Sequence, residues 1–162
     1  MTRSTRGWWI LALAVASCVT HAGPMAHADD ALDARFFDAR GRQLYALSEF
    51  DAALRAFLRA DAIAPSATTA YNVGLTAELA SEPLLAWNAY ERFLRTAPDE
   101  HRLRADATRR QHGLDGRVQV IEVASSPEGA EVFVDRVDHG VLGRTPLRVA
   151  LPAGAHTVLL RA

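Results

Sequence analysis

A repeat with a period of 33 residues constrains the fold of this chain more than any other feature of its sequence. Four residues of the first copy recur at that offset, as Gly41 and Gly74, Ala53 and Ala86, Phe57 and Tyr90, and Pro65 and Pro98. A period of this length is typical of stacked helix pairs, in which each pair buries its apolar face against the next. The sequence therefore predicts two consecutive helix pairs over residues 29–98.

Small polar residues ahead of each apolar stripe predict where the four helices begin. The candidate N-caps, in chain order, are Asp29 or Asp30, Ser48 with Asp51 as a capping box, a residue in the cap region from Ser66 to Thr69, and Ser81. Pro83 then falls in the first turn of the fourth helix, where its missing N–H is tolerated.

A fifth helix is predicted over residues 99–114, where it would cap the stack. Acidic residues at its start, Asp99 and Glu100, complement the helix dipole, and Arg109 and Arg110 precede Gly113 at its end. A repeat stack normally needs about three copies to be stable alone. Two copies fall short of that, so we expect this helix, the C-terminal part or a partner to supply additional stability.

After Gly116 the apolar pattern changes to short β-rich runs separated by Pro and Gly turns. These runs cover residues 118–123, 131–135, 147–149 and 156–160. They predict a small antiparallel β module over residues 115–162. The expected fold class is therefore multidomain, with an α-helical repeat stack followed by a β module.

Two sets of residues recur in the repeat region. The first copy contains Gly41, Ser48-Glu49-Phe50-Asp51, Ala53, Phe57, Ala60 and Pro65, and the second contains Tyr71-Asn72-Val73-Gly74, Ala86, Tyr90 and Pro98. Through these residues the repeat region resembles the tetratricopeptide repeat (TPR) family. The second copy departs from the family pattern at Pro83 and Phe93. The resemblance implies that the first helix of each pair lines a concave groove.

Two stripes of polar and aromatic residues lie on the helices that would line that groove. They are Arg35, Asp38, Arg42 and Tyr45 on the first helix, and Tyr71, Leu75 and Glu78 on the third. Their spacing places each set along one face of a helix. A mixed stripe of this kind suits a peptide ligand, and a merely solvated helix face is the alternative.

The C-terminal part contains four motifs, Pro127-Glu128-Gly129-Ala130, Val132-Phe133-Val134-Asp135, Gly143-Arg144-Thr145-Pro146 and Leu151-Pro152-Ala153-Gly154-Ala155-His156. Through these motifs it resembles the PEGA domain. The resemblance implies a small extracytoplasmic β module without known catalysis, in which His156 makes a structural hydrogen bond. The loop from Arg136 to Leu142 is longer than is usual in the family. The family also continues past the His-containing strand, so either that strand is an open edge here or the chain continues beyond Ala162.

The N-terminal residues 1–28 have the pattern of a secretory signal peptide. Arg3 and Arg6 precede an apolar run from Trp8 to Val19, and Ala26-His27-Ala28 offers a cleavage site. An alternative is a lipoprotein signal, because Val15-Ala16-Ser17-Cys18 resembles a lipobox whose cysteine would be lipidated. The predicted location is therefore periplasmic or secreted, with a lipoprotein anchored to a membrane through Cys18 as the alternative.

The sequence offers no constellation for catalysis. The chain has no lysine, no Gly-x-Ser-x-Gly motif and no Gly-rich phosphate loop, and its one cysteine lies in the signal segment. Asp135, Asp138 and His139 share one loop, but we interpret them as a polar turn rather than a metal site. We expect no enzymatic activity, no cofactor and no metal ion.

The charge balance favours neither nucleic acid nor a membrane surface as a partner, and we expect no nucleic-acid partner. Without residues 1–28 the chain keeps 16 arginines against 19 acidic residues, a net charge of −3.

Taken together, the groove, the signal segment and the missing catalytic motifs lead us to expect a non-enzymatic interaction or scaffolding protein of the bacterial cell envelope that binds a protein or peptide through the groove. The alternatives are a lipoprotein acting as an accessory subunit of an envelope complex and a binder of cell-wall polysaccharide. Contact with a membrane is expected only if Cys18 is lipidated.

Overall fold

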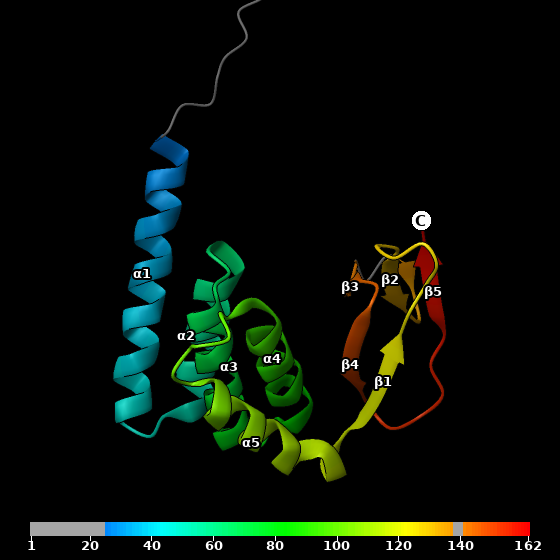
Figure 1. Cartoon of the computed structure of the whole chain (residues 1–162). Coiled ribbons are helices and arrows are strands. Elements are labelled where there is room, and N and C mark those ends of the chain that lie inside the picture. Colours follow the sequence, from blue (N-terminus) through cyan, green and yellow to red (C-terminus); the bar gives the residue numbers. More distant parts are fainter. Residues whose placement is uncertain (1–24, 138–140) are drawn as a thin grey trace, which may run out of the picture.

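The computed structural model describes residues 25–137 and 141–162, and it consists of five helices followed by a small β module (Figure 1). The helices are α1 (Met25–Ala46), α2 (Phe50–Ile63), α3 (Ala67–Leu79), α4 (Pro83–Thr96) and α5 (Arg104–Leu114), and a 3-10 turn, η1 (Asp115–Arg117), follows. The strands are β1 (Gln119–Val123), β2 (Glu131–Val134), β3 (Gly143–Arg144), β4 (Leu147–Leu151) and β5 (Val158–Arg161). The predicted fold class, helices first and an antiparallel β module second, is confirmed.

The two helix pairs, α1 with α2 and α3 with α4, are held by the same contact 33 residues apart. A Cβ atom added to Gly41 would lie 2.7 Å from the Phe57 ring, and one added to Gly74 would lie 2.7 Å from the Tyr90 ring. Each glycine therefore lets an aromatic side chain of the partner helix approach its backbone. The sequence repeat thus corresponds to a repeated packing contact.

Only one of the predicted serine caps is found. At α3, the Thr69 N–H donates to the Ser66 hydroxyl at 3.0 Å, and the Ser66 N–H donates to the Thr69 hydroxyl at 2.9 Å. The predictions for Ser48 and Ser81 were wrong, because α2 and α4 start after Glu49 and Glu82 without a side-chain cap. Both serines have positive φ angles, 60° and 62°. Each of the two short links, between α1 and α2 and between α3 and α4, therefore has its serine in the left-handed region.

Two helix starts also differ from the prediction. Helix α1 begins at Met25 rather than after Asp29 or Asp30, so residues 25–28 form its first turn. The rest of the predicted signal segment, including Cys18, lies outside the described residues. Helix α5 begins at Arg104 rather than near residue 99. The Arg104 guanidinium donates to the carbonyl oxygens of Leu94, at 2.6 Å, and Ala97, at 3.0 Å, and so ties α5 to the end of α4.

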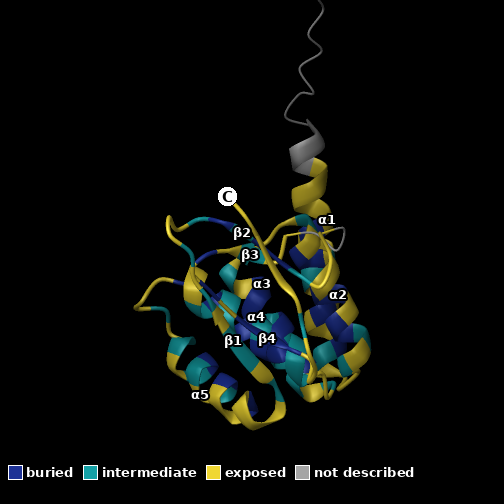
Figure 2. Ribbon diagram, turned by 90° about the vertical axis from the view of Figure 1, so that its right-hand side faces the viewer, coloured by how far each residue is buried: buried dark blue, intermediate teal, exposed yellow. Residues whose placement is uncertain are grey.

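The core of the helical part lies between α2, α3 and α4, where Figure 2 shows the buried residues. Its largest fully buried side chains are those of Trp87, Tyr90 and Phe93, all on α4. The first turns of α1 extend beyond the other helices and are exposed where their side chains are described (Figure 2). None of the helices in residues 25–137 and 141–162 combines the length and apolar character that crossing a membrane requires.

The β module consists of two small antiparallel sheets. One pairs β1 with β4, and the other has the order β3-β2-β5. Their facing sides bury Val132, Leu147, Val149 and Leu151. Strand β3 was not predicted, because two residues are too few to show an alternating pattern. As the sequence suggested, β5 lies at a sheet edge, and its Leu160 side chain is 46% exposed.

Candidate functional site

The helical part and the β module are joined through a side-chain amide of α4. The Asn88 Nδ2 group donates to the Ala150 carbonyl oxygen at 2.9 Å, and the Ala150 N–H donates to the Asn88 Oδ1 atom at 2.8 Å. Asn88 thus pairs with β4 as a residue of a neighbouring strand would. Ala150 is 2% exposed and belongs to the same apolar core as the helices. The two parts therefore share a packed junction.

Charged and aromatic groups extend this junction on the side of β1. The Trp87 indole N–H donates to the Asp115 carboxylate at 2.8 Å, and the Arg148 guanidinium lies 5.5 Å from the centre of the Trp87 ring. Arg148 also pairs with Glu91 of α4, at 3.4 Å, and with Glu122 of β1, at 3.0 Å. These contacts fix how β4 lies against α4.

We expect Asn88→Ala to lower the free energy of unfolding by about 1–3 kcal/mol, because it leaves the Ala150 N–H and carbonyl without their partner. Asn72→Ala is a matched control. Asn72 is also half-buried, but its side chain makes one long hydrogen bond, 3.5 Å, to Asp38. Urea unfolding followed by circular dichroism measures both effects. Equal losses in the two variants would show that the Asn88 pairing does not stabilise the junction.

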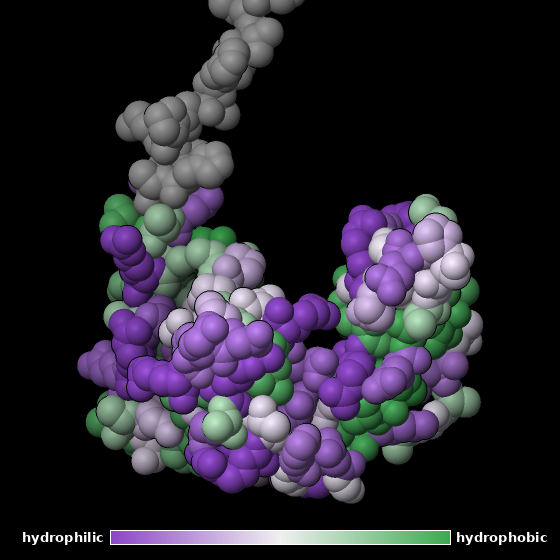
Figure 3. Space-filling view, in the orientation of Figure 1, coloured by the Kyte–Doolittle hydropathy of each residue, from purple (hydrophilic) through white to green (hydrophobic). Residues whose placement is uncertain are grey.

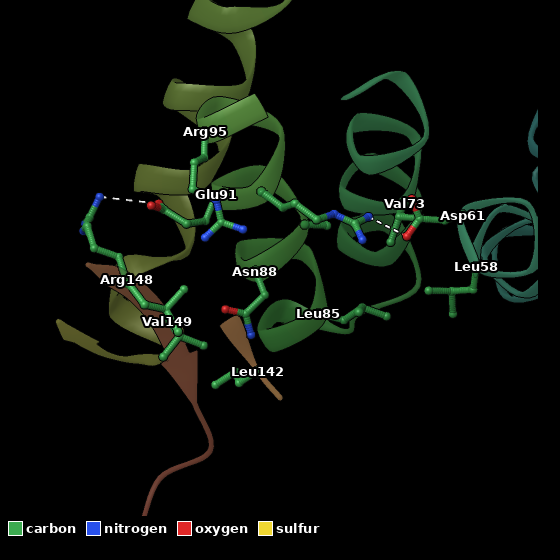
Figure 4. A pocket seen from close by; sticks show the side chains of 13 residues that line it. Leu58, Asp61, Val73, Leu85, Asn88, Glu91, Arg95, Leu142, Arg148 and Val149 are labelled. Atoms are coloured by element: carbon green, nitrogen blue, oxygen red, sulfur yellow. Dashed lines mark hydrogen bonds and ion pairs between the residues drawn. The ribbon is translucent and has the colours of Figure 1, made fainter. Parts of the chain in front are cut away.

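A cleft of about 220 Å³ opens beside this junction, and we call it the junction cleft. The space-filling view shows the helical part and the β module separated by a notch (Figure 3). The cleft is lined by Leu58 and Asp61 of α2, Val73 of α3, Leu85, Asn88, Ala89, Glu91, Arg92 and Arg95 of α4, and Leu142, Leu147, Arg148 and Val149 of the β module. The lining thus mixes apolar and charged side chains (Figure 4).

Most charged groups in the junction cleft are paired. The Arg92 guanidinium lies 2.6 Å from the carboxylate of Asp61, which also accepts a hydrogen bond from the Thr69 hydroxyl at 2.9 Å. Glu91 accepts from Gln111 at 2.8 Å. Arg95 is exposed, and within the described part of the chain its guanidinium has no hydrogen bond or ion pair. The cleft therefore carries one cation that is available to a ligand.

The predicted stripe on α1 is partly exposed. Arg35 and Arg42 face solvent, and Asp38 forms an ion pair with Arg42 and accepts a 3.5 Å hydrogen bond from Asn72 of α3. Tyr45 instead packs edge-on against Phe50, with ring centres 5.7 Å apart, and contacts the core. The structure thus brings Arg35, Asp38 and Arg42 to one surface and directs Tyr45 inward.

The predicted stripe on α3 is largely engaged by α5. The Tyr71 hydroxyl donates to Asp106 at 2.6 Å, while Glu78 accepts from the Tyr90 hydroxyl at 2.9 Å and pairs with Arg110 at 3.1 Å. Leu75 is half-buried and packs against the core. Sequence analysis did not identify these partners, because nothing in the local pattern shows which face of α3 the fifth helix covers.

This network shifts the ionisation of its members. Burial, with the Asp106 carboxylate adding to it, raises the pKa of Tyr71 to about 12. Burial, together with Glu78, also raises the pKa of Tyr90. The hydrogen bond from Tyr71 lowers the pKa of Asp106. Both phenols are therefore neutral hydrogen-bond donors at physiological pH, and the network holds α5 in place.

The predicted structural hydrogen bond of His156 is present in the β module. Its Nδ1 atom lies 2.8 Å from Asp135 and its Nε2 atom 2.9 Å from the Pro152 carbonyl oxygen, and the Asp135 contact raises the pKa of His156. Asp138 and His139 lie outside the described residues. Among the residues that are described, no three His, Cys, Asp or Glu side chains are arranged to hold a metal ion.

The sequence analysis did not identify the junction cleft. Its two walls come from residues about 60 positions apart, such as Asn88 and Val149, and their proximity depends on how the β module docks on α4. The one available signal was a polar residue, Asn88, directly after Trp87 in the predicted fourth helix. That signal alone did not indicate a partner.

Comparison with known proteins supports the description of the β module. Residues 118–162 match the family model of the PEGA domain, which is typical of extracellular or periplasmic proteins and suggests a binding role. No curated protein and no solved structure matches the chain. The helical part is a helical repeat by its packing, and its assignment to the tetratricopeptide family stays a prediction.

Proposed function

We propose that this protein has no catalytic role and binds a polypeptide segment of a partner protein in the bacterial cell envelope, as a scaffold. The observation that carries the proposal is the junction cleft, which is lined by side chains of both the helical part and the β module. Such a cleft forms only when α4 and β4 are docked. It combines apolar side chains with a few charged groups, which is the usual composition of a peptide-binding surface.

A polypeptide suits this lining better than a polysaccharide does. Sugar rings are generally held by stacking on aromatic side chains, and none of the residues that line the junction cleft is aromatic. The leucines Leu58, Leu85 and Leu142 can instead receive apolar side chains of a peptide. Polysaccharide binding therefore has less support than peptide binding.

The exposed part of the predicted groove is a second candidate surface. Arg35 and Arg42 face solvent there, and the Asn72 amide reaches Asp38 across the two helix pairs. This surface lacks most of its predicted α3 half, because Tyr71 and Glu78 are bonded to α5. We therefore consider the junction cleft the better candidate for the binding site, and the groove the second.

The PEGA match supports an extracytoplasmic location, and the signal segment adds to that proposal. The predicted cleavage after Ala28 would release a periplasmic or secreted protein, whereas lipidation of Cys18 would anchor an accessory subunit to a membrane. The mass of the mature N-terminal peptide distinguishes these outcomes. A peptide that starts at Asp29 supports the first, and a lipidated Cys18 supports the second.

Site-specific photo-crosslinking in cells tests the proposed function. We expect a photoreactive amino acid at Leu58 or Leu142, which line the junction cleft, to form a defined adduct with an envelope protein. Leu79 is a matched control, because it is 42% exposed, close to the 45% of Leu142, and lies outside the cleft. Adducts from Arg42 without adducts from Leu58 would move the binding surface to the groove. Absence of adducts at all these positions would contradict the proposal.

A further inference from the structure

We propose that the ligand of the junction cleft is a short extended segment with acidic side chains, which adds as a strand to the free edge of β4. This inference rests on the proposed function and specifies the binding mode and the chemistry of the partner. Three features of the cleft carry it: the orientation of the β4 backbone, the apolar lining and the available Arg95.

One residue of β4, Arg148, offers unpaired backbone hydrogen-bonding groups to the cleft. Their direction follows from Ala150, whose N–H and carbonyl point away from β1 and bond to Asn88. In an antiparallel pair, residues two positions apart point their backbone groups to the same side, so those of Arg148 also face α4. No partner for these groups of Arg148 is found in residues 25–137 and 141–162. Such an edge is a template for another strand.

The same geometry limits the length of the added strand. At one end of the free edge, the backbone N–H and carbonyl of Ala150 are already hydrogen-bonded to the Asn88 side chain. At the other end Pro146 has no N–H to donate, although its carbonyl can accept. The edge therefore offers one donor and two acceptors, from Arg148 and Pro146. That number suits a segment of about three paired residues rather than a long strand.

The charged side chains of the junction cleft favour a segment with acidic residues. The two carboxylates in the lining are already engaged, Asp61 by Arg92 and Thr69, and Glu91 by Gln111 and Arg148. Arg95 remains as an exposed cation without a partner among the described residues. Since successive side chains of a strand point to opposite sides, one set can contact Leu142 and Val149 while the other approaches Arg95. Alternating apolar and acidic residues fit this arrangement.

Peptide binding to the purified protein tests the charge preference. The probe is a fluorescein-labelled peptide of sequence Val-Glu-Val-Glu-Val-Glu-Val, compared with the same peptide carrying lysine in place of glutamate. We expect fluorescence anisotropy to show saturable binding of the glutamate peptide only, and Arg95→Glu to weaken that binding about tenfold. Arg55→Glu is the matched control, because Arg55 is an exposed arginine of α2 outside the junction cleft. Failure of the glutamate peptide to bind, or equal binding of both peptides, would overturn the proposal.

Hydrogen exchange measured by NMR tests the strand pairing itself. We expect the glutamate peptide to slow exchange of the Arg148 amide about tenfold, because the added strand would accept its hydrogen bond. The amide of Val149, which faces β1, serves as the internal control and should change little. Peptide binding without protection of Arg148 would show that the segment does not bind as a strand. Crosslinks from Leu58 would then still support the proposed function, so the two proposals fail separately.

Discussion

Replacing Trp87 by alanine is expected to lower the free energy of unfolding by about 3–5 kcal/mol, the usual cost of removing a large buried side chain. Trp87 is fully buried in the core of the helical part. Its loss also removes the hydrogen bond to Asp115 and the ring beneath the Arg148 guanidinium. The substitution should therefore loosen the contact between α4 and the β module as well. Urea unfolding at 25 °C followed by circular dichroism measures the effect.

Trp87→Phe separates the contribution of apolar burial from that of the hydrogen bond to Asp115. Phenylalanine keeps most of the apolar volume but cannot donate to Asp115, so we expect a loss of about 1–2 kcal/mol. A loss below about 1 kcal/mol for Trp87→Ala would contradict the packing described here, because a cavity of that size in a close-packed core costs more.

Replacing Gly74 by leucine is expected to destabilise the protein by about 3 kcal/mol, at the upper end of the cost of overpacking. Even the Cβ atom of the new side chain would lie 2.7 Å from the Tyr90 ring. That ring cannot move aside easily, because it is fully buried and its hydroxyl is bonded to Glu78. Helices α3 and α4 would have to separate to admit leucine, and the thermal midpoint of unfolding would fall.

Gly113→Leu is the matched control for this prediction. Gly113 also lies in a helix, α5, but nothing lies within 4 Å of an added Cβ atom there. Because leucine favours a helix over glycine by nearly 1 kcal/mol, we expect a small gain in stability. If both leucine variants changed the unfolding midpoint in the same direction, the close approach of α3 and α4 at Gly74 would be refuted.

The two helix pairs of the helical part could be predicted from the sequence. Gly41 with Phe57, and Gly74 with Tyr90, recur at the repeat offset, and each pair meets in the structure. The PEGA-like runs likewise predicted four of the five strands. These features depend on residues close in the chain or on a motif that repeats, so a local pattern is enough to reveal them.

The helix caps show where local patterns fail. Ser48 and Ser81 have the residue type of an N-cap, yet both adopt left-handed conformations in the turns before the caps. Ser66 has the same residue type and does cap its helix. The difference lies in the link between the helices, whose short path the packing of each pair fixes, and not in the serine itself.

The sequence by itself determined the order of helices and strands, the paired packing of α1 with α2 and α3 with α4, and the kinds of side chain available for binding. Only the tertiary structure decided which of those side chains are accessible. Docking of α5 engages Tyr71 and Glu78, and docking of β4 on Asn88 creates the junction cleft beside Arg95. The physical reason is that periodicity reports the face of each element that is buried, whereas a site between elements depends on contacts between residues far apart in the chain.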